Sequence, residues 1–173
     1  MNNIRSLSKK QLLCFVSGII AFAVGSCVLS FFGIRKLHRE FQKQKLMREN
    51  TVIEIAELDI KAPVLEGTER SVLSRGAGHF SGTGTIGSGN YCIAAHSSTI
   101  YKEYFNELKN AEKGMEILLY DHNDHSAKYR ISQSFIVDPD DTWILEDKGD
   151  DRITLVTCTD DGTQRQVVIG MLE

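Results

Sequence analysis

Apolar positions divide the chain into one long uninterrupted run and a later region of short alternating segments. Residues 11–34 carry no charged side chain over 24 consecutive positions. A helix of that length, at about 1.5 Å per residue, spans the roughly 30 Å hydrocarbon core of a bilayer with some tilt. The pattern therefore predicts a transmembrane segment over 11–34, preceded by a short tail at 1–10.

A cleaved secretory signal peptide is the competing interpretation of this run, because Arg5, Lys9 and Lys10 give it a basic start. The run is longer than the roughly 7–15 residues of a typical signal-peptide core, and no A-x-A-like cleavage site closes it. We therefore favour an uncleaved signal-anchor. Residues 35–51, which follow it, are charged and lack a strong apolar face, and we interpret them as a juxtamembrane stalk.

Beyond residue 51 the apolar residues come in short runs separated by turn residues. Residues 52–60 alternate apolar and polar side chains, as a half-buried strand does. Four further segments are apolar enough to form strands: 90–96, 114–138, 152–158 and 164–172. Many short strands imply a closed β-barrel or a sandwich, which we expect to occupy residues 52–173 as one mainly β domain.

Turn and helix signals fill the intervals between these strands. The segment 114–138 has a polar centre at 121–126, so we expect a hairpin there. Residues 76–90 include six glycines, which favours turns, and the stretch lacks the spacing of a phosphate-binding loop. One short helix is expected over 98–110, where aromatic and leucine side chains recur on one face.

The charge of the chain excludes one class of partner and complicates the orientation in the membrane. Residues 50–173 hold 11 Lys or Arg and 21 Asp or Glu, a net charge of −10. Nucleic acid is therefore a poor partner, because a basic face supplies most of that affinity. The flank after residue 34 has more Lys and Arg than the flank before residue 11, and the positive-inside rule by itself favours a cytoplasmic C-terminal domain.

Two groups of side chains have types that could bind a metal ion. His122 and His125 lie close to Asp121 and Asp124, but a hairpin tip requires such residues for its turn, and no further ligand follows. Seven acidic residues between 138 and 151 lack the ordered spacing of a calcium loop. We interpret both groups as solvated turns and expect neither a metal nor a cofactor.

The cysteines point to a different chemistry. Only Cys92 and Cys158 lie outside the apolar run, too few for a disulfide framework, although one bond between them is compatible with the sequence. Cys158 ends an apolar strand, Arg165 begins the next one, and His96 ends an earlier one. A thiol nucleophile needs a group that transfers protons and a group that stabilises an oxyanion. These residue types supply all three functions, while an inert core cysteine and a surface arginine remain the alternative.

The same residues resemble the sortases, a family of membrane-anchored cysteine transpeptidases of Gram-positive bacteria. TLVTC at 154–158 is similar to the family's TLxTC signature, Arg165 follows on the next strand, and IAAH at 93–96 is similar to the strand that ends in the family's histidine. The resemblance covers about residues 52–172. It is strongest to the class A, housekeeping type.

The resemblance implies an eight-stranded barrel with its active site at one rim. Cys158 would attack the Thr–Gly carbonyl of an LPxTG-like sorting signal and form a thioacyl enzyme. His96 would protonate the leaving amine and deprotonate the incoming one, while Arg165 would hold the substrate backbone and the oxyanion. Thr157 would help to shape the substrate groove. Acyl transfer to an amine of a cell-wall precursor would then anchor a surface protein to peptidoglycan.

The resemblance also implies a single-pass membrane protein with a cytoplasmic tail and an extracellular catalytic domain, against the charge count. Two other hypotheses stay open. One is a membrane-tethered cysteine peptidase that releases the acyl group to water, and the other is a non-catalytic barrel that binds peptides or wall components. The connection 159–164 is short and acidic, so its effect on substrate preference is left unassigned. Cys92 is interpreted as a buried packing residue.

Overall fold

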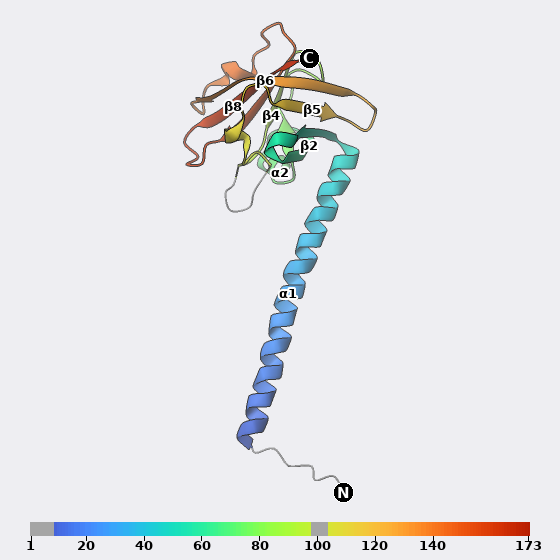
Figure 1. The fold of residues 1–173 in the computed structure, drawn as a ribbon, viewed down its shortest axis with the longest axis vertical. Coiled ribbons are helices and arrows are strands. Elements are labelled where there is room, and N and C mark those ends of the chain that lie inside the picture. The colour runs from blue at the N-terminus through green and yellow to red at the C-terminus, as the bar shows by residue number, and fades with distance from the viewer. Residues whose placement is uncertain (1–8, 98–103) are drawn as a thin grey trace. The chain divides into compact units, whose positions relative to one another are not determined.

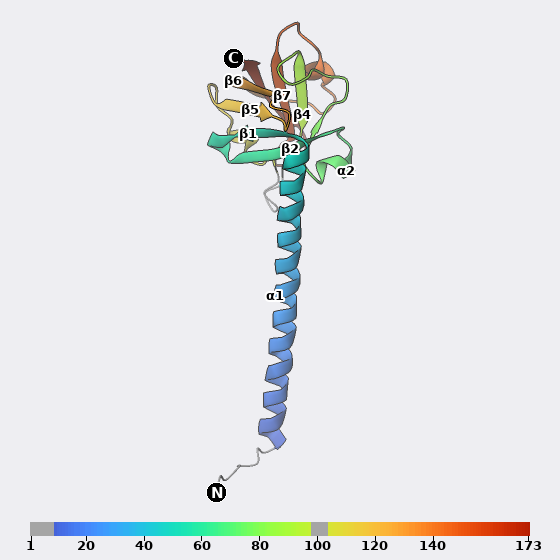
Figure 2. The same ribbon diagram turned by 90° about the vertical axis from the view of Figure 1, so that its right-hand side faces the viewer.

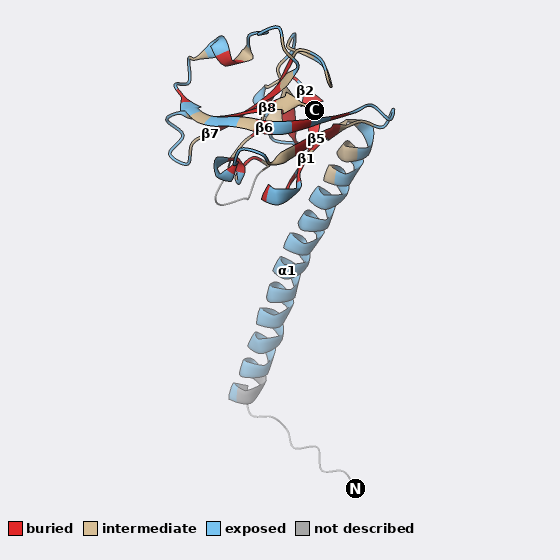
Figure 3. Cartoon of the chain, turned by 45° about the horizontal axis from the view of Figure 1, so that its top comes forward, coloured by how far each residue is buried: buried red, intermediate tan, exposed pale blue. Residues whose placement is uncertain are grey.

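The computed structural model describes residues 9–97 and 104–173, and the chain divides into two compact units, Met1–Gln42 and Lys43–Glu173. One continuous helix, α1 (Lys9–Glu49), contains the apolar run and residues 35–49 of the predicted stalk (Figure 1). Between residues 13 and 42 its side chains are exposed, as the pale blue of Figure 3 shows. By length and composition α1 can cross a membrane, although a signal sequence near the N-terminus meets the same description.

The second unit is a closed barrel. Within the described residues, eight strands close in the order β1-β2-β3-β4-β7-β8-β6-β5, with β1 paired to β5 (Figure 2). They are β1 (Thr51–Ile55), β2 (Ile60–Glu66), β3 (Ala77–His79), β4 (Asn90–Ala94), β5 (Glu116–Tyr120), β6 (Ser126–Val137), β7 (Arg152–Cys158) and β8 (Arg165–Leu172). The β2/β3 and β4/β7 pairs are parallel and the others antiparallel. The prediction of an eight-stranded barrel is confirmed.

Short helical turns connect the strands. They are η1 (Ala56–Leu58), α2 (Arg70–Leu73), η2 (Leu108–Asn110) and η3 (Thr142–Leu145). The hairpin expected over 114–138 is confirmed as β5 and β6, because residues 121–125 form its turn. Asp121 accepts hydrogen bonds from the N–H groups of Asn123 and His125, as the side chain of a turn-forming aspartate does.

Two local predictions were wrong, and a third was correct for most of its length. The strand expected over 52–60 is broken by η1, after which Asp59 takes a left-handed φ of 52° and the chain turns back. The described part of the segment 98–110 forms turns and η2 rather than a helix, and residues 98–103 lie outside the described residues. The glycine-rich stretch forms turns over residues 81–89, as predicted, and also contains β3. A Cβ on Gly78 would lie 2.2 Å from the Gly67 carbonyl oxygen, so the glycine permits the close approach.

Side chains alternate between two buried clusters along β7, one inside the barrel and one on its outer face. Ile153 and Leu155 belong to the large interior cluster, whereas Val156 belongs to a second cluster with Val167 and Ile144 of η3. Successive side chains of a strand point to opposite faces. Cys158 therefore shares the outer face with Val156, two residues earlier.

Candidate active site

Cys158 and Arg165 lie opposite each other at the ends of two neighbouring strands. Cys158 is the last residue of β7, Arg165 is the first of β8, and their Cα atoms are register partners. Residues directly opposite in an antiparallel pair project to the same face of the sheet. Both predicted strand ends are confirmed, and both side chains belong to the outer face of the barrel.

His96 reaches the same rim through the parallel pairing of β4 with β7. Strand β4 ends at Ala94, two residues before the predicted end, and Ala94 is the register partner of Val156. The pairing continues beyond the strand, because the Ala95 N–H donates to the Val156 carbonyl oxygen at 3.1 Å. When the register of Ala94 with Val156 is extended by two residues along each strand, His96 lies beside Cys158.

Two hydroxyl groups hold residues 95–97, which extend β4, against β7 through hydrogen bonds. Thr157 Oγ1 donates to the Ala95 carbonyl oxygen at 2.8 Å, and Ser97 Oγ donates to the Cys158 carbonyl oxygen at 2.8 Å. The backbone on both sides of His96 is therefore tied to the backbone of the strand that ends in Cys158. No pattern in the sequence indicated this role for Ser97.

A pocket of about 210 Å³ opens beside the thiol. Cys158 and Thr157 line it together with Asn106 and Gln166, whereas His96 and Arg165 are not among its lining residues. The hydroxyl of Thr157 is already engaged with the backbone, so this side chain contributes shape to the pocket wall rather than a free hydrogen-bond donor.

The connection from β7 to β8 is a tight turn built around a carboxylate. Asp161 accepts hydrogen bonds from the hydroxyls of Thr159 and Thr163, which lower its pKa to about 2. The neighbouring Asp160 pairs with Lys109 at 2.7 Å. Both carboxylates are thus partnered within the protein, and the short turn holds Arg165 opposite the cysteine.

The two cysteines outside α1 differ in their surroundings. All four cysteines of the chain are free, so no disulfide joins Cys92 to Cys158. Cys92 is completely buried, and burial raises the pKa of its thiol to about 11. Cys158 is half-buried at the pocket. Because only a thiolate is a good nucleophile, Cys158 is the candidate and Cys92 is a packing residue.

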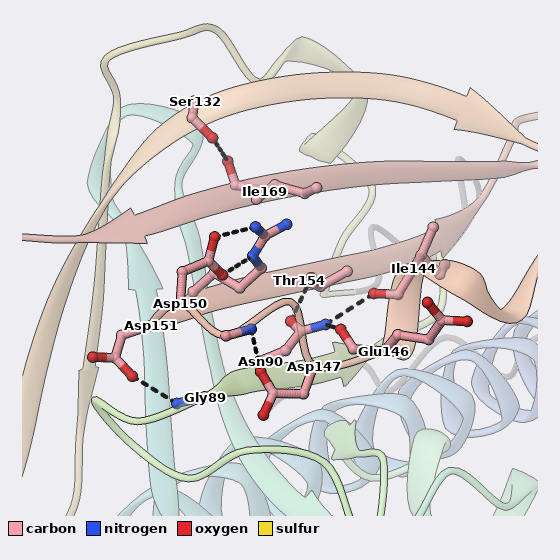
Figure 4. A network of polar contacts seen from close by, with 12 residues as sticks. Gly89, Asn90, Ser132, Ile144, Glu146, Asp147, Asp150, Asp151, Thr154 and Ile169 are labelled. Carbon is pink, nitrogen blue, oxygen red and sulfur yellow. Dashed lines mark hydrogen bonds and ion pairs between the residues drawn. The ribbon is translucent and has the colours of Figure 1, made fainter.

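The two groups of side chains with metal-ligand types have other partners. In the hairpin tip the His125 ring and the turn N–H groups lower the pKa of Asp121 to about 2. In the connection from β6 to β7, Asp151 accepts from the Gly89 N–H at 2.8 Å and Asp150 pairs with Arg152 (Figure 4). Across residues 9–97 and 104–173 no three metal-ligating side chains gather into a site.

Comparison with known proteins places the barrel in a family. A profile of the sortase domain matches residues 53–173. Sortase A of Bacillus anthracis is 36% identical over 123 residues, which are 69% of this chain and 58% of that protein. The chain spans between 51% and 58% of the length of the curated relatives that it matches, all of which are named Sortase A.

Solved structures show the same similarity. Sortase A of Listeria monocytogenes superimposes with a TM-score of 0.68 at 26% identity, covering 73% of this chain and 88% of that one. A sortase D5 transpeptidase of Clostridium perfringens superimposes with a TM-score of 0.65 at 31% identity, covering 78% and 88%. In each case the similarity extends over most of the barrel.

Proposed function

This chain belongs to the sortase family, and we propose that it is a cysteine transpeptidase whose acyl-enzyme forms on Cys158. The catalytic residues are His96, Cys158 and Arg165, and Thr157 shapes the substrate groove. The observation that carries the proposal is the register at the rim, where Cys158 faces Arg165 across β7 and β8 and the extension of β4 runs beside the other edge of β7. A short turn joins Cys158 to Arg165, whereas His96 comes from a distant part of the sequence, and in the proposed site all three lie at the ends of neighbouring strands.

The reaction follows from the chemistry of these groups. The sulfur of Cys158 attacks the carbonyl carbon between Thr and Gly of the peptide, a C–S bond forms, and the C–N bond breaks. His96 gives a proton to the leaving amine. An incoming amine then attacks the thioester, His96 takes its proton, and the thiolate leaves. The guanidinium of Arg165 stabilises the oxyanion in both steps, because a fixed cation lowers the energy of charge that develops in the transition state.

The substrate that we propose is a surface protein with a C-terminal LPxTG-like sorting signal, and the acceptor is an amine of a peptidoglycan precursor. Residues 11–34 anchor the enzyme in the cell membrane after a cytoplasmic tail at 1–10. Residues 35–51 form the stalk, and 52–173 form the catalytic domain outside the cell. Donor and acceptor then meet at the wall, where such precursors are used. The reaction uses side chains alone and needs no cofactor.

The test is product analysis with the full-length chain in detergent micelles. A set of LPxTG-like peptides is incubated with and without amine nucleophiles, and products are identified by mass spectrometry. We expect an amide product that replaces the hydrolysis product as the amine concentration rises. Cys158→Ala should abolish both products, and Cys92→Ala is the matched control that should retain them.

Two results would argue against this assignment. Hydrolysis that no amine diverts identifies a peptidase instead of a transpeptidase. Peptide binding without cleavage, equal in the wild type and in Cys158→Ala, identifies a non-catalytic barrel.

A further inference from the structure

A buried amide joins the sheet to the connection between β6 and β7. Asn90, the first residue of β4, is 2% exposed. Its Nδ2 donates to two carbonyl oxygens of that connection, those of Ile144 and Glu146, each at 3.0 Å (Figure 4). The acceptors lie 54 and 56 residues away in sequence, so one side chain links two distant parts of the barrel.

A second side chain fixes which way the amide faces. Thr154 of β7 is completely buried, and its hydroxyl donates to Asn90 Oδ1 at 2.7 Å. Oδ1 is therefore held towards β7, and the two N–H groups are held towards η3. Every strong hydrogen-bonding group of the carboxamide is used, which is the condition under which a buried polar group specifies one arrangement.

Apart from the apolar packing of Ile144 and the stacking of Trp143 on Phe135, few contacts other than those of Asn90 hold this turn. η3 has four residues, and its N-cap Asp141 makes no side-chain capping bond. A polar contact between the sheet and this connection lies at its base, where Asp151 accepts from the Gly89 N–H at 2.8 Å. The remaining polar contact to η3 that the described residues offer is a weak one at 4.0 Å, from the Cys92 thiol to the Leu145 carbonyl oxygen.

The position of η3 bears on the site because η3 packs on the face that carries the thiol. Ile144 lies in the outer cluster with Val156 and Val167. Val156 precedes Cys158 by two residues, and Val167 follows Arg165 by two residues, so each shares a face with its catalytic neighbour. On a proposed path along this outer face, a peptide would meet η3 before it reaches Cys158.

We propose that Asn90 is a positioning residue that sets the place of η3 and thereby the affinity for the acyl half of the peptide substrate. The inference rests on the proposed function of the site. Loss of the two N–H donors releases η3, while His96 and Cys158 keep their places through separate backbone contacts. The expected consequence is a weaker peptide affinity at a nearly unchanged rate of the chemical steps.

The sharpest variant is Asn90→Asp, which keeps the acceptor for Thr154 and removes both donors. Trp143 of η3 is the only tryptophan of the chain and stacks on Phe135 at 5.8 Å, so its fluorescence reports where η3 lies. In the full-length chain in micelles we expect stronger acrylamide quenching of Trp143. The KM for an LPxTG-like peptide should rise about tenfold, as the loss of one to two net hydrogen bonds predicts. The kcat should stay within about twofold.

The matched control is Ser132→Ala. Ser132 Oγ donates to the Ile169 carbonyl oxygen at 3.1 Å and so joins β6 to β8, with no bond to η3 (Figure 4). It should change neither the quenching nor the KM. If Asn90→Asp does not fold, as judged by its thermal transition, Thr154→Val takes its place, because it leaves the amide but removes the hydroxyl that orients it. A smaller change in the same direction is then expected.

The readouts separate the two claims. Unchanged Trp143 quenching, or a fall in kcat at constant KM, overturns the positioning role of Asn90. A wild type that turns over no peptide, while Asn90→Asp still exposes Trp143, contradicts the proposed function and leaves the link between Asn90 and η3 supported.

Discussion

At the scale of single residues, burial distinguishes two cysteines whose sequence contexts are similar. Cys92 and Cys158 both lie in largely apolar strands, yet Cys92 is enclosed and Cys158 borders a pocket. Burial disfavours the charged thiolate, which is why the pKa of Cys92 is raised to about 11. Of these two sulfurs, the one that a reactant can reach is at the rim.

This difference predicts a selective chemical modification. In the folded chain at pH 8, iodoacetamide should alkylate Cys158 and spare Cys92, because Cys92 is both inaccessible and protonated. Peptide mapping by mass spectrometry measures the two sites separately. In denaturant both should react. Equal alkylation of Cys92 and Cys158 in the folded chain would show that Cys92 is not enclosed as described.

The side chain of Arg165 makes few contacts that would stabilise the fold, which leads to a second prediction. Its hydrogen bond runs from Nη1 to the carbonyl oxygen of the adjacent Gln164 at 3.0 Å. Arg165→Ala should therefore leave the melting temperature nearly unchanged while lowering kcat roughly a hundredfold to a thousandfold, as the loss of an oxyanion donor does. Arg165→Lys should recover only part of the rate, since lysine lacks the planar fork. Full activity in Arg165→Ala would remove this residue from the mechanism.

At the scale of elements, the turn between β7 and β8 has its own pH dependence. The pKa of Asp161 is about 2 in the folded chain, below its ordinary value of 3.8, so its ionised form stabilises the fold above about pH 4. That contribution is lost as the pH falls from about 4 towards 2. Asp161→Asn should show a smaller loss of stability over this interval than the wild type, measured by urea unfolding at several pH values. Parallel pH profiles of the two proteins would contradict the assignment.

The elements also show what the sequence could predict. The strands that carry Cys158 and Arg165 were predictable at their ends, because β7 and β8 are nearly continuous apolar runs. The break at Asp59 was not, since the alternation of residues 52–60 hides a reversal that depends on one left-handed residue. Nor could the pattern show that β4 pairs with β7, a parallel contact between segments about 60 residues apart, without which His96 has no neighbour.

The hydrogen bonds by which Asn90 holds η3 could not be predicted, for a related reason. Asn90 lies at the start of an apolar strand, where an asparagine looks like a turn residue. Its acceptors are backbone carbonyl groups, which every residue carries, so the sequence cannot show which of them it binds. Only the crossing of two distant segments reveals why a polar side chain is buried there. Family resemblance named the residues at the rim, whereas contacts of this kind require coordinates.

At the scale of the whole molecule, orientation in the membrane is where two sequence arguments disagree. Basic residues after the apolar run favour a cytoplasmic domain, while wall chemistry requires an extracellular one. We expect the extracellular orientation. Protease added to intact protoplasts should digest residues 52–173 and leave a cytoplasmic marker protein whole. Protection of the domain until the membrane is lysed would establish the opposite orientation and exclude a wall substrate.

The central claim is that Cys158 carries the acyl group between donor and acceptor. The most direct measurement is acid quenching of the full-length chain during turnover of an LPxTG-like peptide without amine, followed by peptide mapping. We expect an acyl mass on the fragment that contains Cys158, released by hydroxylamine as a thioester is. Cleaved peptide together with an acyl group on another residue, or with none on Cys158, would contradict the account.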